Sequence, residues 1–204
     1  MHHYYLEKMG ITPWILREDQ NTLSALQCLT NEVAACTRCP LHSTRTQTVF
    51  ARGNPQAKLM LIGEAPGFHE DQQGVPFVGA AGSLLHKMIA CIGLDQDQIY
   101  MTNVLKCHSP NNQDPQPDEM SQCSTYLAQQ IAIVKPLLII ALGHLAGQYL
   151  LNTTQSLSSM RTRMHQYQNI PVMVTYHPAE LLKNPRDKKI AYQDWLASQR
   201  FLAS

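Results

Sequence analysis

The 204-residue sequence lacks the features that mark membrane-spanning, secreted and broadly DNA-coating proteins. It has no apolar run near the ~20 residues that cross a bilayer, and its N-terminus lacks the charged-then-apolar pattern of a signal peptide. The formal net charge is only +1, so any contact with nucleic acid should be local. There is no internal repeat, low-complexity tract or GxxxxGK[ST] phosphate loop. We therefore expect a cytoplasmic chain with no membrane partner.

Short apolar runs alternate with helix-like segments along most of the chain. The runs of strand length lie at 58–62, 99–105, 137–142 and 170–176. The helix-like segments between them lie at 83–92, 118–134 and 144–151. This alternation is typical of parallel strands joined by right-handed crossovers. It predicts an α/β fold with a parallel sheet covered by helices.

The two ends of the chain carry helical patterns of their own. One pattern begins at Thr22 and runs toward the first cysteine pair, while residues 1–30 suggest an N-terminal extension of unknown role. A closing helix is expected after Pro185. Its buried face should carry Ala191, Trp195 and Leu202.

Polar residues or glycines follow each of the four expected strands. They are Glu64, Asn103, Gly143 with His144, and His177. Because the carboxyl ends of parallel strands meet at one edge of a sheet, these residues should converge there. The glycine-rich loop at 63–82 adds Phe77, whose ring offers a flat face for stacking. An ordinary strand-to-helix turn is the alternative reading of this loop taken alone.

The six cysteines argue against a disulfide framework in a cytoplasmic chain and indicate a metal site instead. Four of them form a CxxC pair and a widely spaced pair: Cys36 with Cys39, and Cys107 with Cys123. The spacing does not match the two knuckles of a zinc ribbon, whereas a [4Fe-4S] cluster tolerates varied spacing. Zinc and free buried thiols stay open as alternatives. Cys28 and Cys91 are expected to pack as buried thiols on apolar helix faces.

Six motifs, taken together and in order, resemble the family 4 uracil-DNA glycosylases, the iron-sulfur members of their superfamily. They are Cys36-x-x-Cys39-Pro-Leu, Gly63-Glu-Ala-Pro-Gly67, Gly74-x-Pro-Phe-Val-Gly79-x-x-Gly82, Thr102-Asn-Val-x-Lys-Cys107, Pro110-Asn-Asn-x-Asp-Pro-x-Pro117 and His177-Pro-Ala-x-Leu-Leu182. The resemblance runs from about Cys36 to Leu202. It implies a three-layer α/β/α sandwich with a central four-stranded parallel sheet, in which residues 31–204 form the catalytic domain.

The resemblance also implies a cofactor and an activity. The cofactor is a [4Fe-4S] cluster on Cys36, Cys39, Cys107 and Cys123. The activity is removal of uracil from DNA, which leaves an abasic site for base excision repair. We further expect the DNA to be single- or double-stranded and the protein to be a monomer. Such an enzyme must first flip the base out of the duplex.

Residue roles within the cleft follow from the same resemblance. Asn103 reads the uracil edge, since a carboxamide offers both a donor and an acceptor. Phe77 stacks on the flipped ring. His177 donates to the charge that develops on uracil O2. These three residues form the expected recognition site.

Water activation is assigned among the acids and amides after the first strand. Glu64 is the first choice for orienting the water or stabilising the cationic sugar. Ala65 stands where other branches of the superfamily carry an aspartate, and backbone amides around it can add to uracil binding. Glu70 matches a family acid near the uracil C5 edge, where a thymine methyl would clash.

A few residues are expected to hold the DNA. Leu181 or Leu182 can serve as a wedge that fills the gap left by the flipped base, with Lys183 and Arg186 near phosphates. Ser83, at a helix start, can present amides to a phosphate. Further candidates for phosphate contacts are Lys106, Arg161 and Arg163.

Three other functions compete with uracil excision. One is a non-catalytic iron-sulfur DNA-binding module, which would not need Asn103 and His177 at strand ends. Another is a zinc-stabilised nucleotide-binding domain, which would need the missing phosphate loop. The third resembles a relative that traps uracil-DNA covalently through a histidine in an arginine-rich loop. His108 is not assigned that role, because the segment after Cys107 has no such basic insertion.

Overall fold

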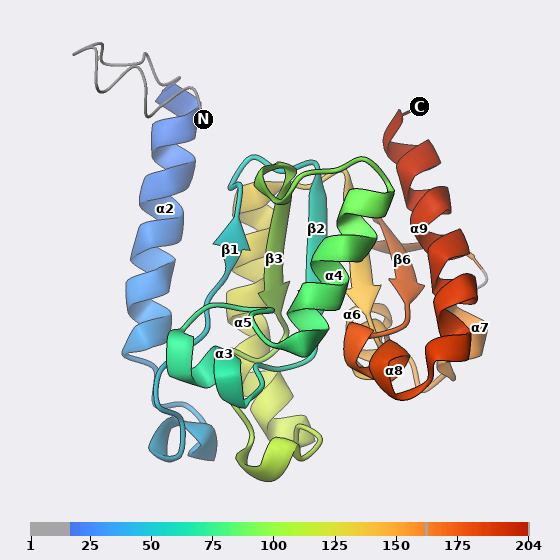
Figure 1. Cartoon of the computed structure of the whole chain (residues 1–204). Helices are drawn as coiled ribbons and strands as arrows, with labels where there is room; N and C mark the ends of the chain where they lie inside the picture. The colour runs from blue at the N-terminus through green and yellow to red at the C-terminus, as the bar shows by residue number, and fades with distance from the viewer. Residues whose placement is uncertain (1–16, 162, 204) are drawn as a thin grey trace.

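The computed structural model describes residues 17–161 and 163–203 (Figure 1). Its helices are α2 (Arg17–Ala34), α3 (Phe68–Gln73), α4 (Ala80–Cys91), α5 (Pro117–Val134), α6 (His144–Leu151), α7 (Leu157–Arg161), α8 (Pro178–Lys183) and α9 (Lys188–Ala203). Its strands are β1 (Arg52–Gly53), β2 (Leu59–Gly63), β3 (Ile99–Asn103), β4 (Leu138–Leu142), β5 (His165–Tyr167) and β6 (Ile170–Thr175). No helix in these two ranges is long and apolar enough to span a bilayer.

The described strands form one six-stranded sheet in the order β1-β3-β2-β4-β6-β5. The four central strands, β3, β2, β4 and β6, are parallel, and β1 and β5 pair antiparallel at the two edges. Every residue of β2, β3 and β4 is buried. Strands covered on both faces read as continuous apolar runs, which is why the sequence located them.

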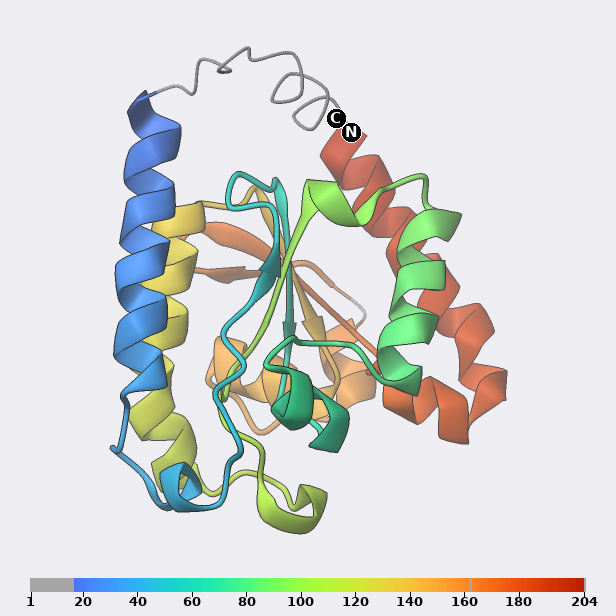
Figure 2. The same cartoon turned by 60° about the vertical axis from the view of Figure 1, so that its left-hand side comes forward.

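Helices cover both faces of the sheet (Figure 2). On one face, side chains of α2, α5 and α6 pack against Met60, Ile62 and Ile139. On the other, α4 and α9 pack against Leu59, Leu61 and their neighbours. The expected three-layer α/β/α sandwich with four central parallel strands is therefore confirmed. The two edge strands were missed, because each is only two or three residues long and neither has an apolar alternation.

The ends of the chain differ in detail from the sequence prediction. Helix α2 includes Arg17 and thus starts before Thr22, and it passes through residue 30 without a break. Residues 1–16 lie outside the described part of the chain. Helix α9 closes the fold as expected, with Ala191 and Trp195 fully buried.

Candidate functional site

A cleft of about 970 Å³ opens at the carboxyl ends of the parallel strands. Here β2 has β3 on one side and β4 on the other, so the strand order reverses at β2. Open α/β sheets bind ligands at such a switch point. The lining includes Glu64, Ala65, Glu70, Phe77, Asn103, His177 and Lys183. Residues at three of the four expected strand ends, Glu64, Asn103 and His177, therefore meet in this cleft, whereas Gly143 and His144 at the end of β4 are not part of its lining.

The side chains of Asn103 and Phe77 pack closely against the backbone of Gly63. Gly63 pairs with Asn103 in the sheet register. A Cβ at Gly63 would overlap Asn103 Oδ1 and lie 2.9 Å from Phe77 Cζ. Phe77 itself has φ 57°, a left-handed conformation that is uncommon for a bulky residue and typical of functional sites. The glycine thus lets a carboxamide and an aromatic ring share one wall of the cleft.

Glu70 holds the turn that carries Phe77. Its Oε1 accepts hydrogen bonds from the backbone amides of Val78 at 2.9 Å and Gly79 at 3.1 Å. The carboxylate therefore fixes the position of the stacking ring as well as lining the cleft. Its expected place at the uracil C5 edge stays a prediction.

His177 is a neutral hydrogen-bond donor at the opposite wall. It caps α8, where its Nδ1 accepts from the Ala179 amide at 3.2 Å. A nitrogen that accepts carries no proton, so the proton of the neutral ring sits on Nε2. Burial lowers the pKa of His177 to about 4, which keeps the ring neutral at physiological pH. The His177 and Phe77 ring centroids lie 6.3 Å apart.

Gly143 makes room for this histidine at the end of β4. Its φ is +94°, which only glycine adopts easily, and a Cβ there would lie 2.9 Å from the Cβ of His177.

Glu64 is half-buried at the end of β2. Burial, together with repulsion from Asp114 and Glu180, raises its pKa to about 7. The carboxyl can therefore exchange a proton near neutral pH, which suits a group that handles water. Ala65 follows it on the cleft wall.

The two leucines proposed as a wedge differ in solvent exposure. Leu181 is fully buried, so the prediction that it can act as a wedge is wrong, whereas Leu182 is 43% exposed on α8. Lys183 and Arg186 are exposed close by in the chain. Their contact with phosphate stays a prediction.

Ser83 does not start a helix. Helix α4 begins three residues earlier, at Ala80, and the Ser83 amide donates to the Gly79 carbonyl at 3.0 Å. The expectation that this amide faces a phosphate is therefore wrong, although the residue is exposed. Gly79 acts as the N-cap, a role the sequence alone did not single out among the glycines of this loop.

Two of the three further basic residues proposed to contact phosphate, Lys106 and Arg161, have other partners in the structure. Lys106 is buried, with 1% of its surface exposed. Arg161 forms a two-pronged ion pair with Asp194, with nitrogen–oxygen distances of 2.9 and 3.0 Å, and its guanidinium lies over the Tyr176 ring. Neither is placed to hold DNA.

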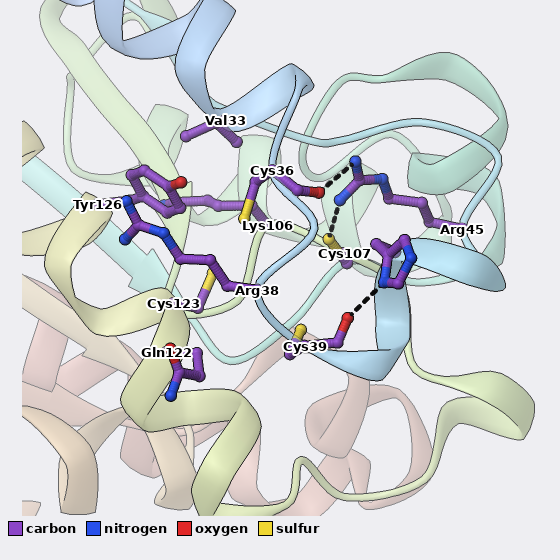
Figure 3. Close-up of a pocket in the computed structure, with 11 residues that line it drawn as sticks. Val33, Cys36, Arg38, Cys39, Arg45, Lys106, Cys107, Gln122, Cys123 and Tyr126 are labelled. Atoms are coloured by element: carbon purple, nitrogen blue, oxygen red, sulfur yellow. Dashed lines mark hydrogen bonds between the residues drawn. The ribbon is translucent and has the colours of Figure 1, made fainter.

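The four cysteines proposed as ligands line a second, smaller cavity of about 290 Å³ (Figure 3). They come from the end of α2, the start of the short helix at Pro40–Ser43, the segment after β3, and α5: Cys36, Cys39, Cys107 and Cys123. In the described ranges, no group of three or more His, Cys, Asp or Glu side chains is arranged to hold a metal ion. The cavity nevertheless brings together the four thiols that the sequence analysis selected.

Arg45 forms hydrogen bonds to two of the four cysteines that line this cavity. Its guanidinium donates to Cys107 Sγ at 3.1 Å and to the Cys36 carbonyl at 2.9 Å (Figure 3). Burial raises the pKa of Cys39, Cys107 and Cys123, the last to about 11. The raised pKa values favour the protonated thiols in the absence of a bound cation.

Cys28 and Cys91 are both exposed, so the expectation that they pack as buried thiols is wrong. The apolar residues near them in sequence turn to the core on other sides of α2 and α4.

Sequence reasoning missed Arg45 and the buried role of Lys106. Arg45 lies in a polar stretch whose spacing from the cysteines carries no signal. Lys106 carried no signal of burial either, because lysine is usually a surface residue.

The comparisons with known proteins agree with this geometry. Residues 50–197 match the family described as the uracil DNA glycosylase superfamily. The chain is 41% identical to the type-4 uracil-DNA glycosylase of Sulfurisphaera tokodaii, over 85% of this chain and 83% of that protein. It is 39% identical to that of Archaeoglobus fulgidus, over 80% and 86%, and 38% identical to that of Saccharolobus solfataricus, over 88% and 87%. The chain therefore belongs to the uracil-DNA glycosylase superfamily, within its type-4 family.

Proposed function

We propose that this chain flips uracil out of DNA and hydrolyses its N-glycosidic bond, which releases free uracil and leaves an abasic site for base excision repair. One observation carries the proposal: Asn103, Phe77 and His177 line a single cleft where the parallel strands end. The names of the type-4 relatives support the same activity.

Recognition uses the shape and the polar edge of the base. Phe77 stacks on the flipped ring, while the Asn103 carboxamide donates to uracil O4 and accepts from N3–H. Cytosine would place a donor against a donor and an acceptor against an acceptor at this edge. A buried mismatch of that kind discriminates by several powers of ten.

Cleavage breaks the bond between C1′ of the sugar and N1 of the base. The electron pair leaves with uracil, whose O2 gains negative charge, and the sugar becomes cationic. The His177 Nε2–H donates to O2. Because the pKa of His177 is lowered to about 4, the ring is neutral and makes this hydrogen bond without carrying a charge. Amides beside Ala65 can add a further donor.

The water oxygen then bonds to C1′, and Glu64 orients this water and takes its proton. This role requires the charged carboxylate. Glu70 keeps the stacking ring in place through its bonds to Val78 and Gly79. Leu182, Lys183 and Arg186 hold the DNA at and around the mouth of the cleft.

The cysteine cavity would hold a [4Fe-4S] cluster on Cys36, Cys39, Cys107 and Cys123. The donor set is four sulfurs from separate segments, and thiolates are the ligands that such clusters take. The cluster would supply a structural anchor, since glycosidic hydrolysis moves no electrons. The monomeric state and the cytoplasmic location stay predictions.

Release of free uracil from a labelled single-stranded oligonucleotide tests the activity. The iron-loaded chain should release uracil and leave thymine and cytosine in place. Binding without release would favour a non-catalytic module. A band that survives denaturing electrophoresis would instead favour covalent trapping, for which His108 is poorly placed because its Nδ1 is bonded to the Pro66 carbonyl at 2.9 Å.

A further inference from the structure

Lys106 lies inside the protein between the cysteine cavity and the end of β3 (Figure 3). Its ammonium donates to Thr102 Oγ1 at 2.7 Å, to the main-chain carbonyl of Asn103 at 2.6 Å, and to Gln130 Oε1. An ammonium has three donors, and all three are used here. Burying the polar end of a lysine is costly unless it is fully hydrogen-bonded, so three acceptors around one buried nitrogen indicate a dedicated role.

The acceptors of Lys106 are themselves fixed. Thr102 Oγ1 donates to the Phe50 carbonyl at 2.7 Å. Gln130 Nε2 donates to the Tyr100 hydroxyl at 3.1 Å. The network is therefore closed, with no loose member that would let the ammonium move.

The same residue also contacts the cysteine centre. It lines the cysteine cavity together with Cys107 and Cys123. Helix α5 carries both Cys123 and Gln130, seven residues and about two turns apart, so both lie on one face of the helix. Lys106 thus lines the cysteine cavity, and its side chain bonds the main chain of the residue that reads uracil.

We propose that Lys106 is a positioning residue for uracil recognition, which anchors the backbone of Asn103 and connects the cysteine centre to the cleft. The inference rests on the proposed function. The carboxamide of Asn103 can distinguish uracil only if its Cα stays in place. The sheet holds the residue on one side through Gly63, and the ammonium holds its carbonyl.

A double-mutant cycle with Lys106→Met and Asn103→Ala tests this inference. Lys106→Met should retain full iron and sulfide content and bind an abasic oligonucleotide, which has no base to read, within about twofold of wild type. Its affinity for free uracil and its single-turnover excision rate should fall roughly 10- to 100-fold, the scale of a displaced recognition group. In the Asn103→Ala background, the same change should add less than about twofold, because the two residues act as one unit. Lys58→Met, an exposed lysine before β2, is the matched control and should leave every measurement unchanged.

A second pair of variants covers the case in which Lys106→Met loses iron. Thr102→Val removes one acceptor and keeps the shape of the side chain, and Thr102→Ser restores the hydroxyl. A slower valine variant with full iron, rescued by serine, supports the proposal, and a valine variant at the wild-type rate overturns it.

Additive losses in the cycle would overturn the inference alone, provided that the wild type releases uracil. An equal loss of abasic-site binding would do the same. A wild-type chain that neither binds nor releases uracil would overturn the proposed function as well.

Discussion

The two cavities of this protein contrast in how they are built and in what they can do. The cleft is formed by strand ends and loops, and its volume is about 970 Å³. The cysteine cavity is about 290 Å³ and brings together thiols from four separate segments. The first contains a neutral donor and a carboxyl whose pKa is about 7, which suit bond cleavage. The second contains two buried and two partly buried thiols, which suit a fixed centre. The contrast supports the proposal that bond cleavage takes place in the first cavity and that the second has a structural role.

The largest expected effect comes from removing one thiol of the cysteine cavity. Cys123→Ser is expected to lose iron and to destabilise the fold by about 4 kcal/mol or more, as is typical when a metal centre is removed. Iron analysis and thermal unfolding measure both. Cys91→Ser, at an exposed thiol, should change neither. Full iron content in Cys123→Ser would remove this residue from the ligand set.

On the cleft side, His177→Ala should slow single-turnover excision about 10²- to 10³-fold, since a donor to the developing oxyanion is lost. Iron content should stay at the wild-type level, which separates the two cavities. The control is His69→Ala, at an exposed position on α3. A rate close to that of wild type would mean that another group stabilises uracil O2.

A methyl group at Gly63 should disturb the cleft without touching the thiols. Gly63→Ala places a Cβ where Asn103 Oδ1 and the Phe77 ring now lie, so excision should fall roughly 10- to 100-fold. Gly93→Ala is the matched control. A Cβ at Gly93 would meet Gln199 Nε2 only at an ordinary contact distance of 3.9 Å, but the φ of Gly93 is +73°. The substitution should therefore lower the free energy of unfolding and leave the excision rate unchanged. Equal activity losses in both variants would contradict the tight packing inferred at Gly63.

The pH dependence should show the smallest effect, confined to the cleft. Because the pKa of Glu64 is raised to about 7, its carboxylate is present above that pH and protonated below it. Excision should therefore level off above pH 7 and fall about tenfold per unit below it. His177 stays neutral across this range, because its pKa is lowered to about 4. Glu64→Gln should be slower and lack this dependence, and an unchanged profile would rule out Glu64 as the titrating group.

The same contrast explains how much could be predicted from the sequence. The strands ending at Gly63 and Asn103 are buried throughout and mostly apolar, so their positions and the convergence of their ends followed from pattern and topology. The CxxC pair and the two later cysteines were found by their type. The edge strands β1 and β5 were too short to leave a pattern.

Side-chain direction was the main information that the sequence did not contain. Leu181 and Leu182 are neighbours of the same type, yet one is buried and the other exposed, which depends on how α8 packs against the rest of the fold. Lys106 looked like a surface base because lysine usually is one. Its burial depends on acceptors from β3 and α5 that only the folded chain brings together.

A crystal structure of the iron-loaded protein with free uracil would test the central claim most directly. We expect the base to stack on Phe77, with the Asn103 carboxamide on its O4 and N3 edge and His177 Nε2 within hydrogen-bonding distance of O2. Uracil bound elsewhere, or bound in this cleft without contact to Asn103 and His177, would contradict the account.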